Sequence, residues 1–251
     1  HKSGMPLQKS IDGSNIQLTI DLEYQSNLEE ELKKRQEETN SSSATGIIMD
    51  PETGEVLAMA TTPGFDNNHF GSTRPEFHRI RSITDQFEPG STFKIVSTVS
   101  ALYEGLISLN DEFNCENGSF EYHTKKITDH ESHSMLTASQ ILHHSSNIGI
   151  IKIMDQVGRK RLFSMSRDFG FGSKTGINLN GEVSGKLYHF NNWSAVSLGM
   201  IAMGHEVGVT AIQLASAYCA LANGGYLLKP RIVHQIMDES ENIIYSEEPV
   251  V

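Results

Sequence analysis

A serine near the middle of this 251-residue chain stands between a Pro-Gly pair and a long apolar segment. Pro89 and Gly90 interrupt regular structure, because proline lacks an amide proton and glycine adopts conformations that other residues avoid. From Phe93 to Leu102 apolar side chains occupy nearly every side of a helix, and Gly105 offers a stop. A helix of this composition belongs in a protein core. We therefore predict that Ser91 lies at the N-terminus of a buried helix.

Lys94 follows Ser91 by three residues, so the two side chains share one helix face, one turn apart. A serine hydroxyl is a weak nucleophile at neutral pH and needs a neighbouring base. Lys94 serves as that base only when it is neutral, and both burial and the positive end of the helix dipole lower the pKa of a lysine. The pattern predicts a nucleophile, Ser91, and its base, Lys94. The alternative interpretation is a solvated lysine beside an N-cap serine.

A second polar motif, Ser145-Ser146-Asn147, comes 54 positions after the first serine (145 minus 91). It lies at a predicted junction between two helices, one opened by a capping box at Thr137 and one over Ile148–Val157. Ser145 supplies a hydroxyl that can relay a proton, and Asn147 supplies an amide that can hold a peptide backbone. In isolation the same residues indicate no more than a polar turn.

The two motifs resemble those of the transpeptidase domain of class B penicillin-binding proteins. The resemblance covers most of the chain, and its later segments are most similar to the division branch of that family. The further matching segments are Asn15–Asp21, Met49–Met59, Phe169–Gly172, Thr175–Leu179, Gly181-Glu182, Gly204–Thr210 and Leu221–Gly225.

The resemblance implies an α+β fold of the penicillin-binding and serine β-lactamase type, with an antiparallel sheet flanked by helices. We expect residues 1–20 to be the end of a linker or pedestal arm and residues 21–251 to be the transpeptidase domain, with its C-terminal strands missing. Individual strands are predicted over residues 16–20, 47–49, 56–59, 226–228, 232–236 and 242–245, and helices after Asp21 and over residues 207–223.

The family has a third motif, Lys-Thr-Gly, on a sheet-edge strand that follows a long helix. The apparent match Lys174-Thr175-Gly176 precedes that helix and lies among glycines that indicate a turn. We interpret it as a chance match and expect the chain to end before the third motif. Because loss of one oxyanion-hole donor costs about 100- to 1,000-fold in turnover, we expect this chain to be weak or inactive by itself.

The family implies cross-linking of peptidoglycan stem peptides in septal wall synthesis. Ser91 would attack the donor peptide, Lys94 would accept its proton, Ser145 would pass a proton to the departing D-Ala, and Asn147 would hold the substrate backbone. β-Lactams would stop the reaction at the acyl-enzyme. The resemblance further implies division-complex partners, a partner glycosyltransferase and a place outside the cytoplasmic membrane, behind an N-terminal anchor that this chain lacks.

Two other functions remain open from the sequence. A serine β-lactamase or β-lactam sensor shares the Ser-x-x-Lys pattern, but it would lack the flanking resemblance around residues 47–59 and 170–225. A non-catalytic scaffold of the cell wall is the second, favoured by the absent third motif.

Histidine, aspartate and cysteine residues gather between the two motifs, and such side chains bind zinc. Elongation-type relatives hold a structural metal in this stretch, which implies Asp111, Asp129, His133 and His143 as a possible remnant of that site. Their spacing fits no standard ligand template, and Leu142 stands where a cysteine is expected. We therefore predict no metal and no other cofactor.

The net charge of −11 and the pI near 5.4 argue against a nucleic-acid partner. No stretch approaches the roughly 20 apolar residues of a membrane span. Two cysteines do not establish a disulfide. Cys219 is predicted to be a core residue, and Cys115 to be a thiol in a polar loop.

Overall fold

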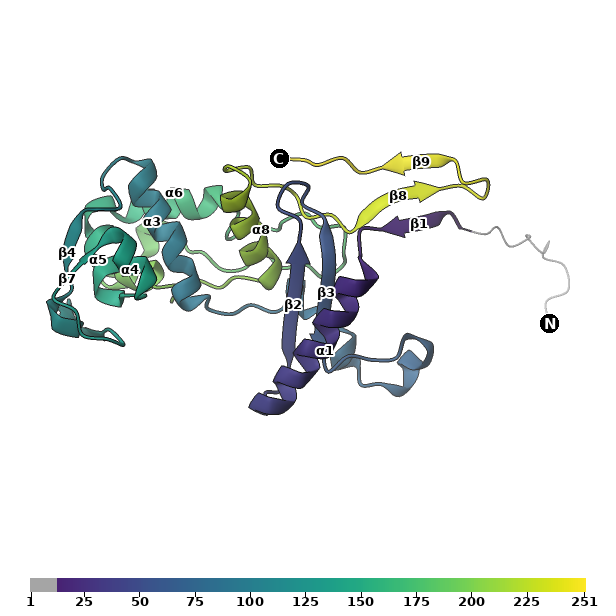
Figure 1. Ribbon diagram of the computed structural model, residues 1–251, viewed down its shortest axis with the longest axis horizontal. Coiled ribbons are helices and arrows are strands. Elements are labelled where there is room, and N and C mark those ends of the chain that lie inside the picture. The colour runs from purple at the N-terminus through teal and green to yellow at the C-terminus, as the bar shows by residue number, and fades with distance from the viewer. Residues whose placement is uncertain (1–12) are drawn as a thin grey trace, which may run out of the picture.

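Helix α3 (Lys94–Tyr103) lies within a helical body at one end of the molecule, and strands dominate the other end (Figure 1). The computed structural model describes residues 13–251. Its helices are α1 (Leu22–Thr39), α2 (Arg81–Thr84), α3, α4 (Ala138–His143), α5 (Asn147–Val157), α6 (Arg159–Asp168), α7 (Ser197–Ala202) and α8 (Ala211–Ala222).

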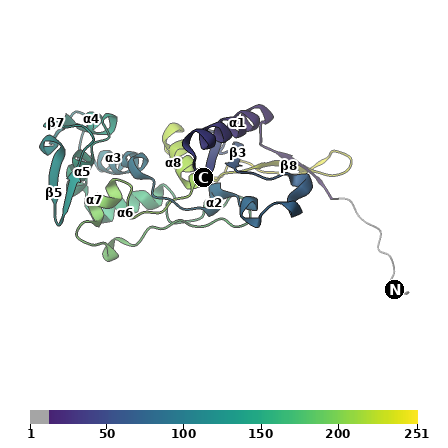
Figure 2. The same cartoon turned by 90° about the horizontal axis from the view of Figure 1, so that it is seen from below.

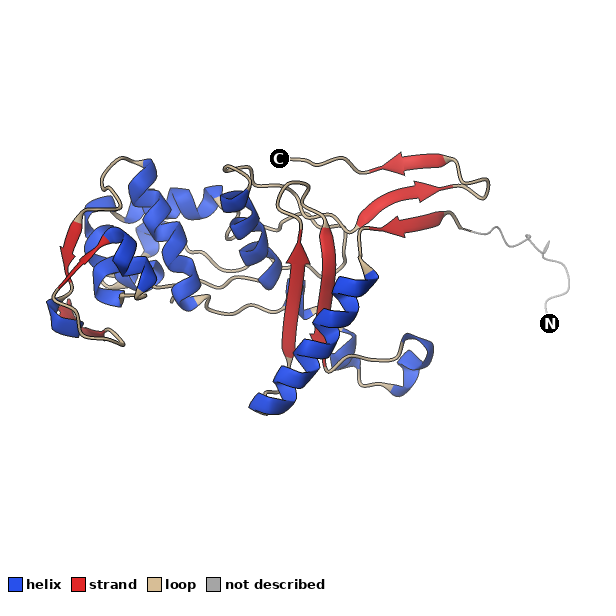
Figure 3. Ribbon diagram, in the orientation of Figure 1, coloured by secondary structure: helices blue, strands red, loops and turns tan. Residues whose placement is uncertain are grey.

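The strands form four antiparallel groups, which Figure 3 shows in red against the blue helices. A three-stranded sheet has the order β1 (Asn15–Leu18), β8 (Val233–Met237), β9 (Ile243–Ser246). The two-stranded groups pair β2 (Ala44–Met49) with β3 (Val56–Thr62), β4 (Glu112–Asn114) with β7 (Met135–Thr137), and β5 (Ser119–Tyr122) with β6 (Lys125–Thr128). The predicted α+β class with antiparallel pairing is confirmed.

The hairpin β2–β3 is covered on both faces. Helix α1 lies against one face, and α2 and α8 pack on the other, as Figure 2 shows for α1 and α2. Gly46 permits the close approach of α1, because a Cβ there would lie 2.7 Å from Leu28 Cδ1. On the opposite face Val56, Ile83 and Ile212 form a small buried cluster. Alternate residues of β3 thus serve two different packing surfaces.

A larger core fills the helical body. Helix α3 packs against α5 and α6, and α5 also packs against α7. Phe93, Ile141, Ile151 and Phe171 are fully buried in this core. Lys94 is the first residue of α3 and Asn147 the first residue of α5, and both helices pack into this core, so the backbone positions of these two residues are fixed by tight packing.

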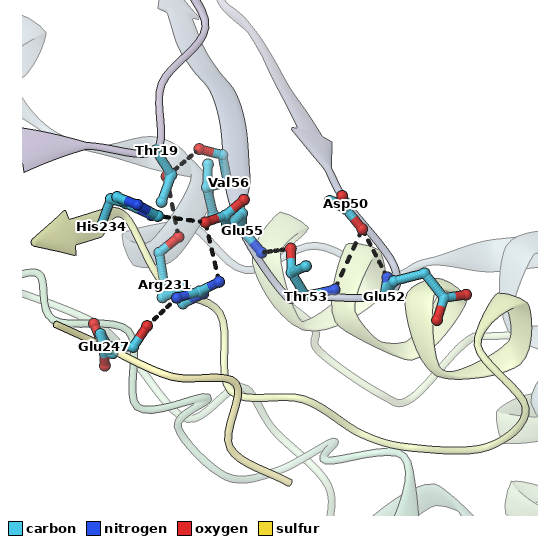
Figure 4. Close-up of polar contacts among 9 residues, drawn as sticks. All are labelled: Thr19, Asp50, Glu52, Thr53, Glu55, Val56, Arg231, His234 and Glu247. Atoms are coloured by element: carbon cyan, nitrogen blue, oxygen red, sulfur yellow. Dashed lines mark hydrogen bonds and ion pairs between the residues drawn. The ribbon is translucent and has the colours of Figure 1, made fainter.

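An ionic network joins the turn after β2 to the segment that leads into β8 (Figure 4). Arg231 Nη2 lies 3.0 Å from Glu55 Oε1, and Arg231 Nη1 donates to the backbone carbonyl of Glu247. His234 Nδ1 lies 3.2 Å from the same Glu55 oxygen. Arg231 is only 7% exposed, so the free-energy cost of burying its charge is offset by these partners.

Several sequence predictions need correction. Residues 226–228 form no strand, because their backbone runs through a loop. The helix predicted from Val207 begins only at Ala211, after its Thr210 cap. Helices α6 and α7 and strands β4–β7 were not predicted, since short amphipathic elements give weak sequence signals.

The environment predicted for Cys115 is wrong, and that predicted for Cys219, inside a helix, is only partly right. Cys115 is fully buried, whereas Cys219 is partly exposed, and both are free thiols. The polar neighbours of Cys115 misled the prediction, because they point outward while the thiol faces the core.

The boundary predicted at residue 20 falls where β1 ends and α1 begins, and residues 1–12 of the predicted arm lie outside the described residues. None of the helices within residues 13–251 is both long and apolar enough to cross a bilayer.

Candidate active site

Ser91 lies in a turn of 3-10 helix, Gly90–Phe93, that runs directly into α3. Its side chain is exposed, whereas Phe93 is fully buried with its ring 5.1 Å from that of Phe171. The prediction that Ser91 opens a buried helix is confirmed, although the first turn is tighter than an α-helix. Ser91 is therefore exposed to solvent, while Phe93 is fixed in the core.

Two contacts from distant segments hold this turn. The backbone N–H of Gly90 donates to the Gly204 carbonyl at 3.1 Å, and the Tyr218 hydroxyl donates to the Thr92 carbonyl at 2.9 Å. Gly204 has φ +82°, and a Cβ there would lie 2.1 Å from the Gly90 carbonyl oxygen. Only glycine fits this position, because any side chain would displace the backbone beside Ser91.

Lys94 is buried, with 2% of its surface exposed, and points at the second motif. Its Nζ donates to Ser145 Oγ at 3.0 Å, to Asn147 Oδ1 at 2.8 Å and to the Ser145 carbonyl. An ammonium has three protons to donate, and these three acceptors match them. Within residues 13–251 no hydrogen bond joins Lys94 Nζ to Ser91.

Burial lowers the pKa of Lys94 from 10.5 to about 8, because the charged form loses its hydration. The negative charge of Asp129 opposes this shift and raises the pKa. A lysine with a pKa near 8 is neutral in an appreciable fraction of molecules at neutral pH. It therefore has a lone pair available for a proton, as the sequence analysis required of a base.

Ser145 occupies the junction between α4 and α5, as predicted. Its backbone is left-handed, with φ +54°, a conformation that costs a non-glycine residue energy. Its N–H donates to the Leu142 carbonyl at 3.2 Å, which fixes the turn. The strained conformation allows both the carbonyl and the hydroxyl of Ser145 to face Lys94.

Asn147 is the first residue of α5, and its amide side chain is held at both ends. Its Oδ1 accepts from Lys94, while its Nδ2 donates to the Thr128 carbonyl at 2.9 Å. An amide nitrogen carries two protons, so this bond uses one of them. The structure thus brings Lys94, Ser145 and Asn147 into direct contact.

Asp129 is the residue of this site whose role the sequence analysis missed. It accepts hydrogen bonds from Ser146 Oγ at 2.6 Å and from the N–H groups of Asn147 and Ile148, at the start of α5. A carboxylate at a helix N-terminus complements the helix dipole. Asp129 was considered only as a metal ligand, because no local pattern links it to a helix that begins eighteen residues later.

The segment Lys174-Thr175-Gly176 lies in irregular backbone directly after a turn and not on a strand, as predicted. The N–H and hydroxyl of Thr175 both donate to Glu182 Oε1 at 2.6 Å, and the Gly176 N–H donates to Glu182 Oε2. Glu182 is 7% exposed. These donors satisfy a buried carboxylate, so they serve the local fold.

A matching family model settles what kind of domain carries this site. The model of the penicillin-binding protein transpeptidase domain matches residues 44–251. The chain belongs to the penicillin-binding protein transpeptidase family. The matched region contains Ser91, Lys94, Ser145 and Asn147.

Curated relatives support the same placement within penicillin-binding proteins. The chain is 32% identical to stage V sporulation protein D of Bacillus subtilis over 230 residues, which cover 90% of the chain and 36% of that protein. It is 33% identical to the peptidoglycan D,D-transpeptidase FtsI of Escherichia coli over 211 residues, or 84% of the chain and 36% of that protein. The chain therefore spans little more than a third of these relatives' lengths.

Solved penicillin-binding proteins have the same fold. The apo structure of penicillin-binding protein 3 from Mycobacterium tuberculosis matches 98% of the chain and 56% of its own length, with a TM-score of 0.89 and 27% identity. The same Mycobacterium protein is also known in complexes with aztreonam and with ampicillin.

Proposed function

We propose that this chain is the acyl-transfer region of a serine D,D-transpeptidase that cross-links peptidoglycan stem peptides during cell division. The observation that carries the proposal is the buried Lys94, whose pKa near 8 suits a base and whose Nζ contacts both Ser145 and Asn147. Membership of the penicillin-binding family and the names of the relatives support the reaction class.

The first step is attack by Ser91 on the donor peptide. Neutral Lys94 removes the proton of the Ser91 hydroxyl as its oxygen bonds to the carbonyl carbon of the penultimate D-Ala. The bond to the terminal D-Ala then breaks, and the departing amine takes a proton from Lys94 through the Ser145 hydroxyl. The products are an acyl-enzyme ester on Ser91 and free D-Ala.

The second step releases the ester. An amine from a neighbouring stem peptide attacks the acyl carbon and loses a proton to the Lys94–Ser145 pair, while the Ser91 oxygen is protonated again. Asn147 holds the donor backbone with the amide proton that Thr128 does not use. The backbone N–H of Ser91 supplies one donor for the oxyanion.

The proposal also includes the location of the enzyme, its partners and its inhibitors. The enzyme acts on the outer side of the cytoplasmic membrane, with division proteins and a glycosyltransferase as partners. β-Lactams imitate the donor peptide and stay on Ser91. The relatives named as transpeptidases and the Mycobacterium complexes with ampicillin and aztreonam support this reading.

The test is covalent labelling with a fluorescent penicillin, followed by intact mass and peptide mapping. The proposal expects one long-lived adduct on Ser91 and none on Ser91→Ala. Rapid loss of the adduct by hydrolysis would instead indicate a β-lactamase. A folded chain that forms no adduct, both at this length and when extended at its C-terminus, would favour a non-catalytic scaffold and overturn the proposal.

A further inference from the structure

Two histidines and a glutamate from two segments of the chain converge close to Ser145. Glu131 and His133 lie in the loop between β6 and β7, and His144 is the C-cap of α4. His133 Nε2 lies 3.2 Å from Glu131 Oε2, and His144 Nδ1 lies 3.4 Å from the same oxygen. One nitrogen or oxygen from each residue lies within 4.8 Å of the other two.

These separations fit a tetrahedral zinc ion. Zinc bonds to imidazole nitrogen and carboxylate oxygen are about 2.0–2.1 Å long, which places neighbouring ligands of a tetrahedron about 3.3 Å apart. Zinc sites with three protein ligands keep a water in the fourth position. The side chain of Glu131 is 61% exposed, while those of His133 and His144 are 25% and 30% exposed, so an ion can enter from the Glu131 side.

The loop that carries two of the ligands is already held in place. The Ser132 hydroxyl donates to the Asn117 carbonyl at 2.7 Å, and the Cys115 N–H donates to the Ser134 carbonyl at 2.7 Å. These bonds flank His133 on both sides. A ligand set that is ordered before binding loses little conformational freedom when the ion arrives.

The third ligand is equally fixed. The His144 N–H donates to the Gln140 carbonyl at 2.8 Å, and the His144 ring lies 4.5 Å from that of His133. The next residue is Ser145, which contacts Lys94 through its hydroxyl. An ion bound by His144 would therefore connect the β6–β7 loop to the residue beside the proposed base.

The fold selects a different ligand set from the one that the sequence analysis considered. Asp129 is occupied at the start of α5, and Asp111 accepts hydrogen bonds from the Ser108 hydroxyl and N–H. Of the four residues considered from the sequence, His133 alone belongs to the group whose ligand atoms converge within residues 13–251. Glu131 and His144 complete that group. Spacing along the sequence could not identify it, because His144 joins the loop only through the fold.

We propose that Glu131, His133 and His144 bind one zinc-class divalent ion, with water as the fourth ligand, and that this ion secures the β6–β7 loop against the α4–α5 junction. This proposal takes the place of the prediction from the sequence that the chain binds no metal. The proposal does not depend on the acyl-transfer chemistry, since binding is measured without substrate.

Isothermal titration of the apo chain with Zn²⁺ tests the proposal, with His133→Ala and His144→Ala as ligand variants. His130→Ala is the matched control, because His130 is an exposed histidine in the same loop and outside the convergent group. We expect one ion per chain and an affinity at least about 100-fold weaker in either ligand variant, since even partners of a ligand contribute 10- to 100-fold. The control should bind like the wild type.

Two further readouts separate a metal site from a hydrogen-bonded cluster or scattered histidines. Co²⁺ should give the visible absorption of a tetrahedral complex in the wild type and in His130→Ala, and lose it in His144→Ala. Zn²⁺ should raise the melting temperature only where the three ligands are present. Equal loss of affinity in His130→Ala, or no stoichiometric binding by a folded wild type, would overturn the proposal.

Discussion

The side chain of Lys94 donates to the hydroxyl of Ser145 across a separation of 51 residues, at 3.0 Å. This contact joins the two polar motifs of the sequence into one site. It exists because α3 and α5 pack against each other and because Ser145 accepts a left-handed backbone. Burial of the lysine at the same contact gives it the pKa of a base.

Lys94 should titrate at about pH 8, well below an ordinary lysine, because burial disfavours its charged form. NMR titration of the lysine side-chain Cε–Hε signals measures this pKa, and Lys94→Arg identifies the signal. An ordinary value near 10.5 would contradict the burial argument.

The same shift makes folding stability depend on pH. Between about pH 8 and pH 10.5 the unfolded chain binds a proton at Lys94 that the folded chain has lost, so stability rises with pH in this window. Below pH 8 the full cost of burying the charge is present, on the order of 3 kcal/mol. Wild type and Lys94→Gln should therefore differ in the pH slope of urea unfolding within this window, and parallel slopes would contradict the assignment.

Asp129→Asn should weaken the start of α5 and lower the pKa of Lys94 further. The variant keeps an amide oxygen that can accept, but the bonds to Ser146 and to two backbone N–H groups lose their charge assistance, which lowers each from about 1.5–3 kcal/mol to about 0.5–1.5 kcal/mol. It also removes the charge that raises the lysine pKa. Urea unfolding and the lysine titration measure the two effects separately. An unchanged lysine pKa would show that Asp129 acts on the helix alone.

Gly204→Ala should displace the turn that carries Ser91. The new Cβ would meet backbone atoms of Gly90, which have no flexible side chain to yield, and φ +82° adds strain of about 1–3 kcal/mol. Gly105→Ala is the matched control, because Gly105 has φ +65° but nothing within 4 Å of its added Cβ. Labelling of Ser91 by penicillin should fall strongly in Gly204→Ala and stay near wild type in Gly105→Ala. Equal labelling of both variants would disprove the positioning role of Gly204.

Arg231→Met should destabilise the fold by about 3 kcal/mol, because it leaves Glu55 without its main partner at a poorly exposed site. Adding Glu55→Leu should recover part of this loss, since the uncompensated charge is then removed. Urea unfolding of the two single variants and the double variant measures the coupling. Strict additivity would show that the two charges do not interact.

The positions of the two polar motifs and of most long elements could be predicted from the sequence because their signals are local. Helix α1 begins directly after Asp21, and the capping box at Thr137 opens α4, both where predicted. Each depends on residues within four positions of one another. Local physics was sufficient for these features.

The remaining features depend on contacts between distant segments. Asp129 at the start of α5 and His144 beside Glu131 have no local signature, and buried Cys115 contacts Ser146, which is distant in the sequence. The contact of Gly204 with Gly90 likewise brings together residues far apart in the chain. These relationships become visible only when the fold is known.

The most direct test of the proposed base and nucleophile is the rate of Ser91 acylation by penicillin as a function of pH. Our account predicts a rate that rises about tenfold per pH unit and levels off near the NMR-measured pKa of Lys94, about 8. Peptide mapping at each pH confirms that the adduct is on Ser91. A rate that does not change from about pH 6 to about pH 9.5, or a midpoint that differs from the lysine titration, would contradict the role of Lys94 as the base.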